Sequence, residues 1–400
     1  MAEFESLYEK AREERILPGY ALLAGDKDGN TLYSAVKGVA SLKEGSTLPF
    51  QLDTICSLAS MTKLMTAVAA LQCVEAGLIT LDEDVSKYMP DIGKYGILTG
   101  FDDAKNEATT VPNPTPISLR MLLSHTNGHE YDWMSPMIMK WRASRGETPW
   151  CGPTVEDKST VPLLYEPGTS WRYGHGTDWA GKLIERVSGK TLDVFMQEKI
   201  WEPLGIKDIT FYPKEKAHMQ GRRAAISTLN EKGEGPAVDA PDFDPLFAAT
   251  DCLGGGGGWG SAEAFFTFLQ AVLRRDSKLL TDASFTELFK PQLDERCKKE
   301  LNDNLKASPM HTQFLGMGLP TDIPKQWSLA GLVNETGQEG RFSEGTIMWG
   351  GVPSMIWFLD LKAGICGTAF CQVIPPMSPS ILALHEQFQR VIYQGLSKEK

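Results

Sequence analysis

Residues 61–76 form an almost continuously apolar run of good helix formers that ends at Gly77, a natural helix stop. A helix that is apolar on nearly every side is buried, so this run predicts a helix in the interior of the fold. The run nevertheless contains Lys63, and because a buried charge is costly, burial favours the neutral amine. Ser60 precedes Lys63 by three residues, a spacing that places both side chains on one face of a helix.

This pair of side chains points to nucleophilic catalysis. A neutral amine beside a serine hydroxyl can activate that hydroxyl, and the free N–H groups at the start of the helix lie where an oxyanion would form. The Ser-x-x-Lys pattern also occurs at 34–37 and 397–400. The first lies in a strand-like run, where residues three apart face opposite ways, and the second lies in a polar tail. Only Ser60 and Lys63 have the required geometry.

The composition of the chain is that of an ordinary globular protein. Its 400 residues suffice for one large or two medium domains, and its net charge of −11 argues against nucleic acid or an anionic membrane as a main partner. The acidic N-terminus lacks the apolar region of a secretory signal, and no run is long enough to span a membrane. The seven cysteines are scattered without paired spacing, which favours buried free thiols. We therefore expect a cytoplasmic protein whose oligomeric state is open.

Strand-like runs lie near both ends of the chain. Two N-terminal runs and three C-terminal runs are joined by short turns, which predicts one antiparallel sheet. Helices expected close to both termini would flank this sheet, so the predicted fold class is α+β. The expected strands cover residues 19–25, 31–37, 345–351, 354–360 and 365–373, and the expected terminal helices cover 3–15 and 380–393.

The middle of the chain has a different character. Between residues 91 and 250 it is rich in proline, glycine and tryptophan, with short helical pieces between long connections. Long loops of this kind usually form binding walls, so we expect a mainly helical lobe inserted into the fold. The sheet domain would then be discontinuous, formed by residues 1–90 and 251–400, with the active site between it and the lobe of residues 91–250.

Tyr173 is the candidate for a third group that would complete proton transfer. It lies between a turn at residues 166–169 and a helix expected from Thr177. The surrounding segment, residues 170–176, is expected to be flexible, so the Tyr173 hydroxyl can project into a cleft.

Ser-x-x-Lys at 60–63 and the tyrosine motif at 173–175 are followed by a late strand that reads Trp-Gly-Gly at 349–351. Together these motifs resemble the serine β-lactamase and penicillin-binding-protein superfamily. The resemblance extends over about residues 15–375 and is to the class C-like branch, which includes the family VIII esterases. It implies a β-lactamase/transpeptidase-like fold, in which an antiparallel sheet is flanked by helices and carries an inserted helical lobe.

Departures from the family pattern narrow the function. The family's Tyr-x-Asn reads Tyr173-Gly174-His175 here, and its Lys-Thr-Gly strand reads Trp-Gly-Gly. In β-lactamases that lysine helps to hold the substrate's carboxylate and that asparagine orients its amide, so their loss disfavours β-lactamase or D-Ala-D-Ala peptidase activity. Trp-Gly-Gly is found in esterases and acyltransferases of the family, and the chain is most similar to fungal statin-pathway enzymes. His175 could assist Tyr173 or simply pack.

The resemblance implies a role for each motif residue. Ser60 attacks an ester carbonyl to form an acyl-enzyme, Lys63 takes the serine proton, and Tyr173 passes a proton to the leaving alcohol and then activates water. The backbone N–H groups of Ser60 and Val352 hold the oxyanion. No cofactor and no metal are expected. The expected substrate-binding residues are Trp349, Gly350, Gly351, His175, Arg172, Trp259 and Gly258.

Two patterns that resemble ligand sites have a structural interpretation. His125 and His129 have the spacing of metal ligands, but an Asn-Gly pair breaks any helix between them, so we expect a turn. The five glycines at 254–258 lack the Lys-Ser/Thr of a phosphate loop, and we expect them to line the cleft. About two of the tryptophans at 133, 141, 171, 259 and 327 are expected as pocket walls.

The predicted function is that of a serine carboxylesterase. By the resemblance, it would hydrolyse the short acyl side-chain ester of a hydrophobic polyketide such as lovastatin, giving monacolin J and 2-methylbutyrate. The alternative is an acyltransferase that loads such an acyl group from a thioester onto a polyketide alcohol, because both reactions share the acyl-enzyme. A non-catalytic binding protein is the third hypothesis, disfavoured by the intact Ser60, Lys63 and Tyr173.

Overall fold

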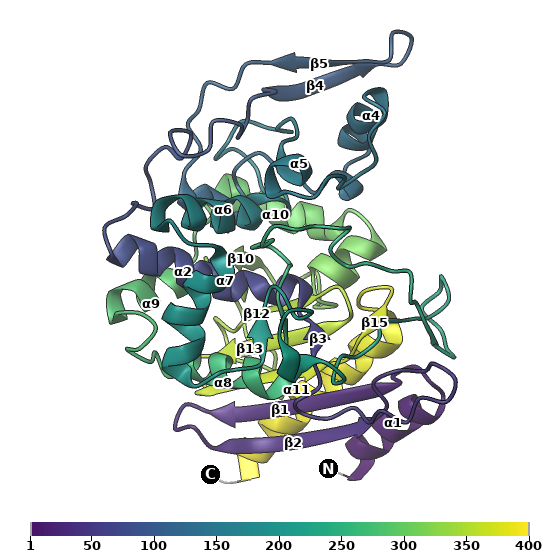
Figure 1. Ribbon diagram of the computed structural model, residues 1–400. Coiled ribbons are helices and arrows are strands. Elements are labelled where there is room, and N and C mark those ends of the chain that lie inside the picture. The colour runs from purple at the N-terminus through teal and green to yellow at the C-terminus, as the bar shows by residue number, and fades with distance from the viewer. Residues whose placement is uncertain (1, 399–400) are drawn as a thin grey trace.

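The computed structural model describes residues 2–398. Among them, seven strands form one antiparallel sheet in which the N-terminal strands pair with the C-terminal ones, in the order β10-β11-β12-β13-β14-β1-β2 (Figure 1). The strands are β1 (Gly19–Asp26), β2 (Thr31–Gly38), β10 (Lys325–Trp327), β11 (Leu332–Asn334), β12 (Ile347–Gly351), β13 (Met355–Asp360) and β14 (Ile365–Phe370).

The predicted α+β fold with one antiparallel sheet is confirmed. β1 pairs directly with β14, so strands from the two ends of the chain meet within the sheet, next to the edge strand β2. The strands β10 and β11 were not predicted, because each has only three residues and too short a pattern to read. The last predicted strand, 365–373, is divided into β14 and a separate strand, β15 (Val373–Ile374), which pairs with β7 (Ser227–Thr228).

Helices cover both faces of the sheet. Phe265 of α8 (Ala262–Leu273) contacts Phe370 of β14, while Phe388 of α11 (Pro379–Lys398) contacts Phe358 of β13. Phe358 pairs with Gly367, an odd number of residues from Phe370, so the two phenylalanines point to opposite faces. The predicted cap of α8 is confirmed, since the Ser261 side chain accepts a hydrogen bond from the backbone of its first turn.

The apolar run predicted as a buried helix forms α2 (Thr62–Glu75), which a 3-10 turn at Ala59–Met61 precedes. Its side chains are buried from Thr62 to Leu71, and it packs against α6 (Gly176–Ser188). Burial on all sides follows from its apolar composition, as expected. The start of α2 therefore lies deep in the molecule, where the surrounding elements can enclose Ser60 and Lys63.

The segment of residues 91–250 holds short helices and small strands. Its hairpin of β4 (Ile97–Asp102) and β5 (Glu107–Val111) was not predicted and lies with α4 at the end of the molecule opposite β1 and β2 (Figure 1). The division into a sheet domain of residues 1–90 and 251–400 and a lobe of residues 91–250 stays a prediction. The other elements here are α3 (Leu119–Ser124), α4 (Pro136–Ser144), α5 (Val155–Ser159), α7 (Leu192–Met196), β6 (Ile209–Thr210) and β8 (Val238–Asp239).

A second small sheet connects this segment to the start of α2. β9 (Trp259–Gly260) lies between β6 and β3 (Cys56–Ser57), and β3 ends just before the 3-10 turn that carries Ser60. The remaining helices are α1 (Ala2–Glu13), α9 (Asp282–Phe289) and α10 (Glu295–Lys306). All seven cysteines are free, and all but the half-buried Cys151 are buried. No helix within residues 2–398 is both long and apolar enough to cross a membrane.

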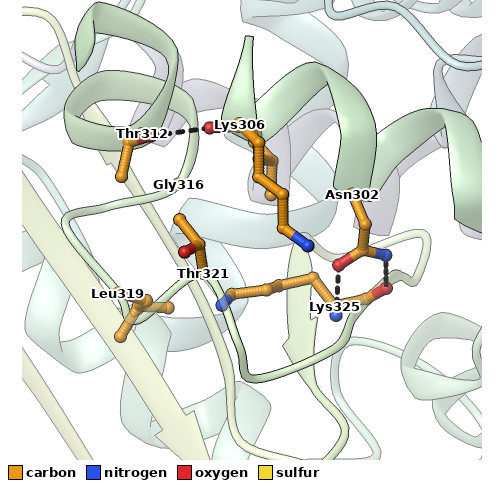
Figure 2. Close-up of a pocket in the computed structure, with 8 residues that line it drawn as sticks. Asn302, Lys306, Thr312, Gly316, Leu319, Thr321 and Lys325 are labelled. Carbon is orange, nitrogen blue, oxygen red and sulfur yellow. Dashed lines mark hydrogen bonds between the residues drawn. The ribbon is translucent and has the colours of Figure 1, made fainter. Parts of the chain in front are cut away.

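Lys325 is the first residue of β10 and is buried. Within residues 2–398, no carboxylate forms an ion pair with it. The Asn302 side chain accepts a hydrogen bond from the backbone N–H of Lys325 at 2.9 Å and donates one to the backbone carbonyl of Lys325 at 2.8 Å (Figure 2). The ammonium Nζ donates to the carbonyls of Pro320 and Ile323. Burial disfavours the charged form and lowers the pKa of Lys325 to about 8.

This depressed pKa predicts a pH dependence of stability. An unfolded lysine has a pKa near 10.4, so between about pH 8 and 10.5 the unfolded chain binds more protons than the folded one. The free energy of unfolding should therefore rise with pH across that window, by up to about 1.4 kcal/mol per pH unit from this group. Lys325→Met should remove that rise in urea denaturation at a series of pH values. Lys232→Met, at an exposed position, provides the matched control, and identical pH profiles for Lys325→Met and the wild type would contradict the assignment.

Candidate active site

Ser60 and Lys63 meet as the spacing predicts. The Lys63 Nζ donates a hydrogen bond to the Ser60 Oγ at 3.2 Å. Lys63 is 5% exposed and Ser60 is 8% exposed. Ala59, directly before the serine, has a φ of 44°, a left-handed conformation that residues with a Cβ rarely adopt. Backbone strain of this kind concentrates at functional sites, which supports the choice of Ser60.

Tyr173 joins the same pair. Its hydroxyl donates a hydrogen bond to the Ser60 Oγ at 2.6 Å, and the Nε1 of Trp349 donates to the tyrosine oxygen at 3.3 Å. The Lys63 Nζ lies 4.6 Å from the centroid of the Tyr173 ring. The structure thus brings together the three side chains that the sequence singled out, with the serine oxygen between an amine and a phenol. That arrangement can move a proton away from the serine and back to a leaving group.

A closed ring of hydrogen bonds holds Lys63 in place. Besides Ser60, its Nζ donates to the carbonyl of Gly255 at 2.6 Å and to the Tyr131 hydroxyl at 3.2 Å. The Tyr131 hydroxyl donates to the Asp178 carboxylate at 3.0 Å, which also accepts the N–H of Gly255 at 2.8 Å. Burial raises the pKa of Asp178. The ring fixes the direction from which the amine approaches the serine.

Tyr131 and Asp178 were not predicted as site residues. Asp178 lies in the first turn of α6, where an acid is ordinarily explained by the helix dipole, and Tyr131 follows the turn at His125. Asp178 lies among the buried residues of α6, and a charged side chain in such surroundings needs a partner, which is the signal that could have pointed to it. Only the tertiary structure shows that this partner network includes Lys63.

The strand β12 approaches the nucleophile closely. A Cβ added to Gly351 would lie 2.6 Å from the carbonyl oxygen of Leu58, and one added to Gly350 would lie 2.2 Å from that of Met355. Only glycine permits these approaches, as expected for the predicted Trp-Gly-Gly strand. Val352, the next residue, lines the same cavity as Ser60. Their backbone N–H groups therefore remain the proposed oxyanion hole.

The cavity at Ser60 has a volume of about 360 Å³ and a mostly apolar wall. Val352 and two glycines of the 254–258 run, Gly255 and Gly256, lie on it, which confirms that this run lines the cleft. Apolar pockets with a few placed polar groups are typical of sites for hydrophobic ligands. Its aromatic residues are Tyr131, Trp133, Trp150, Tyr173, Phe243, Phe247 and Phe314.

None of the seven predicted substrate-binding residues is among those that line this cavity. His175 is fully buried, and its Nδ1 forms a hydrogen bond with the Ser159 hydroxyl, so its geometry is that of a packed residue. Burial and nearby cations also lower the pKa of His175 well below its usual value. Arg172 instead donates to the carbonyl of Trp171 and pairs with Glu300 at 3.7 Å.

The other predicted substrate-binding residues lie near the site without lining its cavity. Gly258 donates its N–H to the Thr62 hydroxyl at 3.0 Å, at the start of α2, and Trp349 reaches the site through Tyr173. Trp259 lines a neighbouring, larger cavity. Of the tryptophans considered as pocket walls, Trp133 lines the Ser60 cavity, while those at 141, 171 and 327 are buried elsewhere.

The remaining motifs have structural positions. His125 ends α3 with a φ of 60°, which confirms the predicted turn, and His129 bonds to the Asn127 side chain. No group of three or more potential metal-ligating side chains occurs within residues 2–398. Of the other Ser-x-x-Lys pairs, Ser34 and Lys37 lie in β2, and the pair at 397–400 extends to Lys400, outside the described residues.

Comparison with known proteins places this geometry in a family. The family described as Beta-lactamase matches residues 4–386. The chain belongs to the β-lactamase family. Lovastatin esterase from Penicillium rubens is 34% identical to it over 99% of both chains. Monacolin J acid methylbutanoyltransferase from Aspergillus terreus is also 34% identical, over 97% of this chain and 94% of the relative.

A solved structure agrees with these relatives. The LovD6 mutant of simvastatin synthase from Aspergillus terreus is 33% identical and superposes with a TM-score of 0.90, covering 99% of this chain and 97% of that one. The predicted resemblance to the esterase and acyltransferase branch of the β-lactamase family is thereby confirmed, as is the β-lactamase/transpeptidase-like fold. The chain is accordingly an enzyme of this family of hydrolases and acyltransferases.

Proposed function

We propose that this β-lactamase-family enzyme is a serine carboxylesterase that cleaves a short acyl side chain from a hydrophobic polyketide alcohol. The observation that carries the proposal is the position of the Ser60 Oγ, which accepts hydrogen bonds from both Lys63 and Tyr173 at the wall of an apolar cavity. A serine so placed has a proton acceptor and a proton donor within reach, which acyl transfer requires.

The proposed reaction uses each group in turn. Lys63, as the neutral amine, takes the proton of Ser60 while the serine oxygen attacks the ester carbonyl, and the backbone N–H groups of Ser60 and Val352 hold the oxyanion. Tyr173 gives its proton to the departing alcohol oxygen and regains one from Lys63, which leaves the acyl group on Ser60. In the second half, Tyr173 passes its hydroxyl proton to the neutral Lys63 and takes a proton from the water that attacks the acyl-enzyme. Lys63 then returns its extra proton to the Ser60 oxygen as the free carboxylic acid leaves.

The relatives suggest the substrate. Their names refer to lovastatin and to monacolin J acid, and their lengths match that of this chain almost completely. An apolar cavity of about 360 Å³ is of the size that suits a bulky hydrophobic ester. We therefore propose lovastatin as a substrate, with monacolin J and 2-methylbutyrate as products.

Acyl transfer is the second candidate function. One observation favours it directly: the relatives include a methylbutanoyltransferase of the same identity as the esterase. The two reactions differ only in whether water or a polyketide alcohol attacks the acyl-enzyme. A partition experiment therefore separates them better than any further inspection of the site.

The test has two arms. The enzyme is incubated with lovastatin, and separately with monacolin J and a 2-methylbutyryl thioester, and the rates of product formation are compared by chromatography. We expect hydrolysis to be the faster reaction, and faster acylation of monacolin J would favour the transferase instead.

A fluorophosphonate should label the wild type at Ser60 and leave Ser60→Ala unlabelled. An unlabelled wild type that turns over neither substrate would refute both functions.

A further inference from the structure

A second cavity, of about 740 Å³, lies beside the one at Ser60. The two share a wall, because Phe243 and Pro245 line both of them. The larger cavity is bounded by the loop of residues 240–251, by residues 223–226 and by Trp259. The second cavity therefore adjoins the first at Phe243 and Pro245.

Arg223 is the unusual residue of the second cavity. Its guanidinium stacks on the ring of Trp259, with the central carbon 4.7 Å from the ring centroid. Neither the Nε of Arg223 nor the Nε1 of Trp259 has a hydrogen-bond partner in the described residues, although both atoms are buried. Its neighbour Arg222 provides the contrast, since it pairs with Asp208 at 2.9 Å. Two buried N–H donors on one cavity wall thus lack an acceptor.

The carboxylates on the same wall do not supply that acceptor. Asp251 pairs with Lys182 at 2.9 Å, and Asp244 accepts the backbone N–H groups of Leu246 and Ala248. Glu215 also lines the cavity, where its side chain is exposed to solvent. Burial without a counter-charge lowers the pKa of Arg223. Buried donors without acceptors destabilise a fold, and a ligand whose oxygens accept from them would remove that cost.

We propose that Arg223 and Trp259 form a binding site for the anionic end of the substrate, a carboxylate or phosphate whose oxygens accept from both donors. The inference deepens the proposed function, on which it rests, because the acyl ester of the same molecule would reach Ser60. A guanidinium presents its N–H donors in a planar fork that suits the oxygens of a carboxylate or phosphate. Trp259 is also rigidly placed, since it pairs with Ser57 of β3, three residues before the nucleophile.

Two substrates could carry such an anion. One is the polyketide alcohol or its ester in the open acid form, which bears a carboxylate. The other is a thioester acyl donor that bears a phosphate. The shared chemistry is an oxyanion at the end of a chain that leads to the acyl carbonyl, and the experiment separates the two sources.

The test compares charged and neutral forms of the same molecule. KM is measured for the hydroxy acid of lovastatin and its methyl ester, and for 2-methylbutyryl thioesters of phosphopantetheine and of pantetheine. For at least one pair the wild type should prefer the anion, and Arg223→Gln should reduce that preference by about tenfold or more. Arg223→Lys keeps the charge but not the planar fork, so its preference for the anion should lie between those of the wild type and Arg223→Gln. Trp259→Phe, which keeps the ring and removes one donor, should show a smaller loss.

The matched control is Lys214→Gln, which removes a positive charge from the exposed rim of the same cavity. It should keep the wild-type preference. A preference that Arg223→Gln leaves unchanged in both pairs overturns the proposal, whereas a loss in one pair supports it and identifies the source of the anion. Calorimetric binding of the acid and the methyl ester to Ser60→Ala keeps the test independent of turnover. If the wild type turns over no substrate, the proposed function fails while this binding comparison still decides on the anion site.

Discussion

Lys63→Met is expected to lower kcat/KM for ester cleavage by about three to four orders of magnitude while the protein stays folded. The Nζ of Lys63 is bonded to the Ser60 oxygen, and no other amine in the described structure is bonded to that atom. Methionine has a similar length and tolerates the apolar surroundings of α2, so the helix should persist. The loss arises because the serine proton then has no amine to accept it.

The measurement pairs steady-state kinetics on a small chromogenic ester with a thermal unfolding curve. Lys37→Met is the matched control, because Lys37 belongs to another Ser-x-x-Lys pair but lies half-exposed in β2, where it pairs with Glu9. Its kinetics should equal those of the wild type. A Lys63→Met enzyme that keeps more than a tenth of the activity, with normal unfolding, would remove Lys63 from the proton route.

The elements that the sequence predicted best depend on local pattern. The helix α2 was predicted to within one residue at each end, because its apolar run and its stop at Gly77 are contained in one stretch. Ser60 and Lys63 are fixed by the same turn, so their contact follows from the spacing. Tyr173 was selected from its local segment and then supported by a family motif, and its 2.6 Å contact with Ser60 depends on the packing of α6 against α2.

The features that sequence reasoning missed depend on contacts between distant segments. Asp178 reaches Lys63 through Tyr131 and Gly255, and these four residues come from four separate parts of the chain. The cavity wall likewise includes Phe314 and the loop around Phe247, neither of which carries a motif. His175 was considered because it takes the place of a family asparagine, yet the backbone turns its ring toward Ser159. Motifs therefore located the proposed reacting groups, whereas the wall of the proposed substrate cavity could be identified only from the fold.

Gly351→Ala is expected to lower kcat by about 10²–10³-fold with a smaller change in KM, the size of effect that follows loss of one oxyanion donor. The new Cβ would lie 2.6 Å from the carbonyl oxygen of Leu58, two residues before Ser60. Neither side can yield freely, since one atom belongs to the strand β12 and the other to the strained turn at Ala59. The backbone N–H groups of Ser60 and Val352 should then separate, which weakens their joint hold on the oxyanion.

Kinetics at saturating substrate together with thermal unfolding distinguish this effect from a general loss of structure. Gly100→Ala is the matched control, because no atom lies within 4 Å of the Cβ it would add. It should leave kcat unchanged. The overpacked Gly351→Ala protein should lose about 1–3 kcal/mol of stability yet remain folded, and fluorophosphonate should still label Ser60, more slowly. A Gly351→Ala enzyme with wild-type kcat would show that the close approach of β12 to Leu58 does not position the oxyanion hole, and the assignment of Val352 would fall with it.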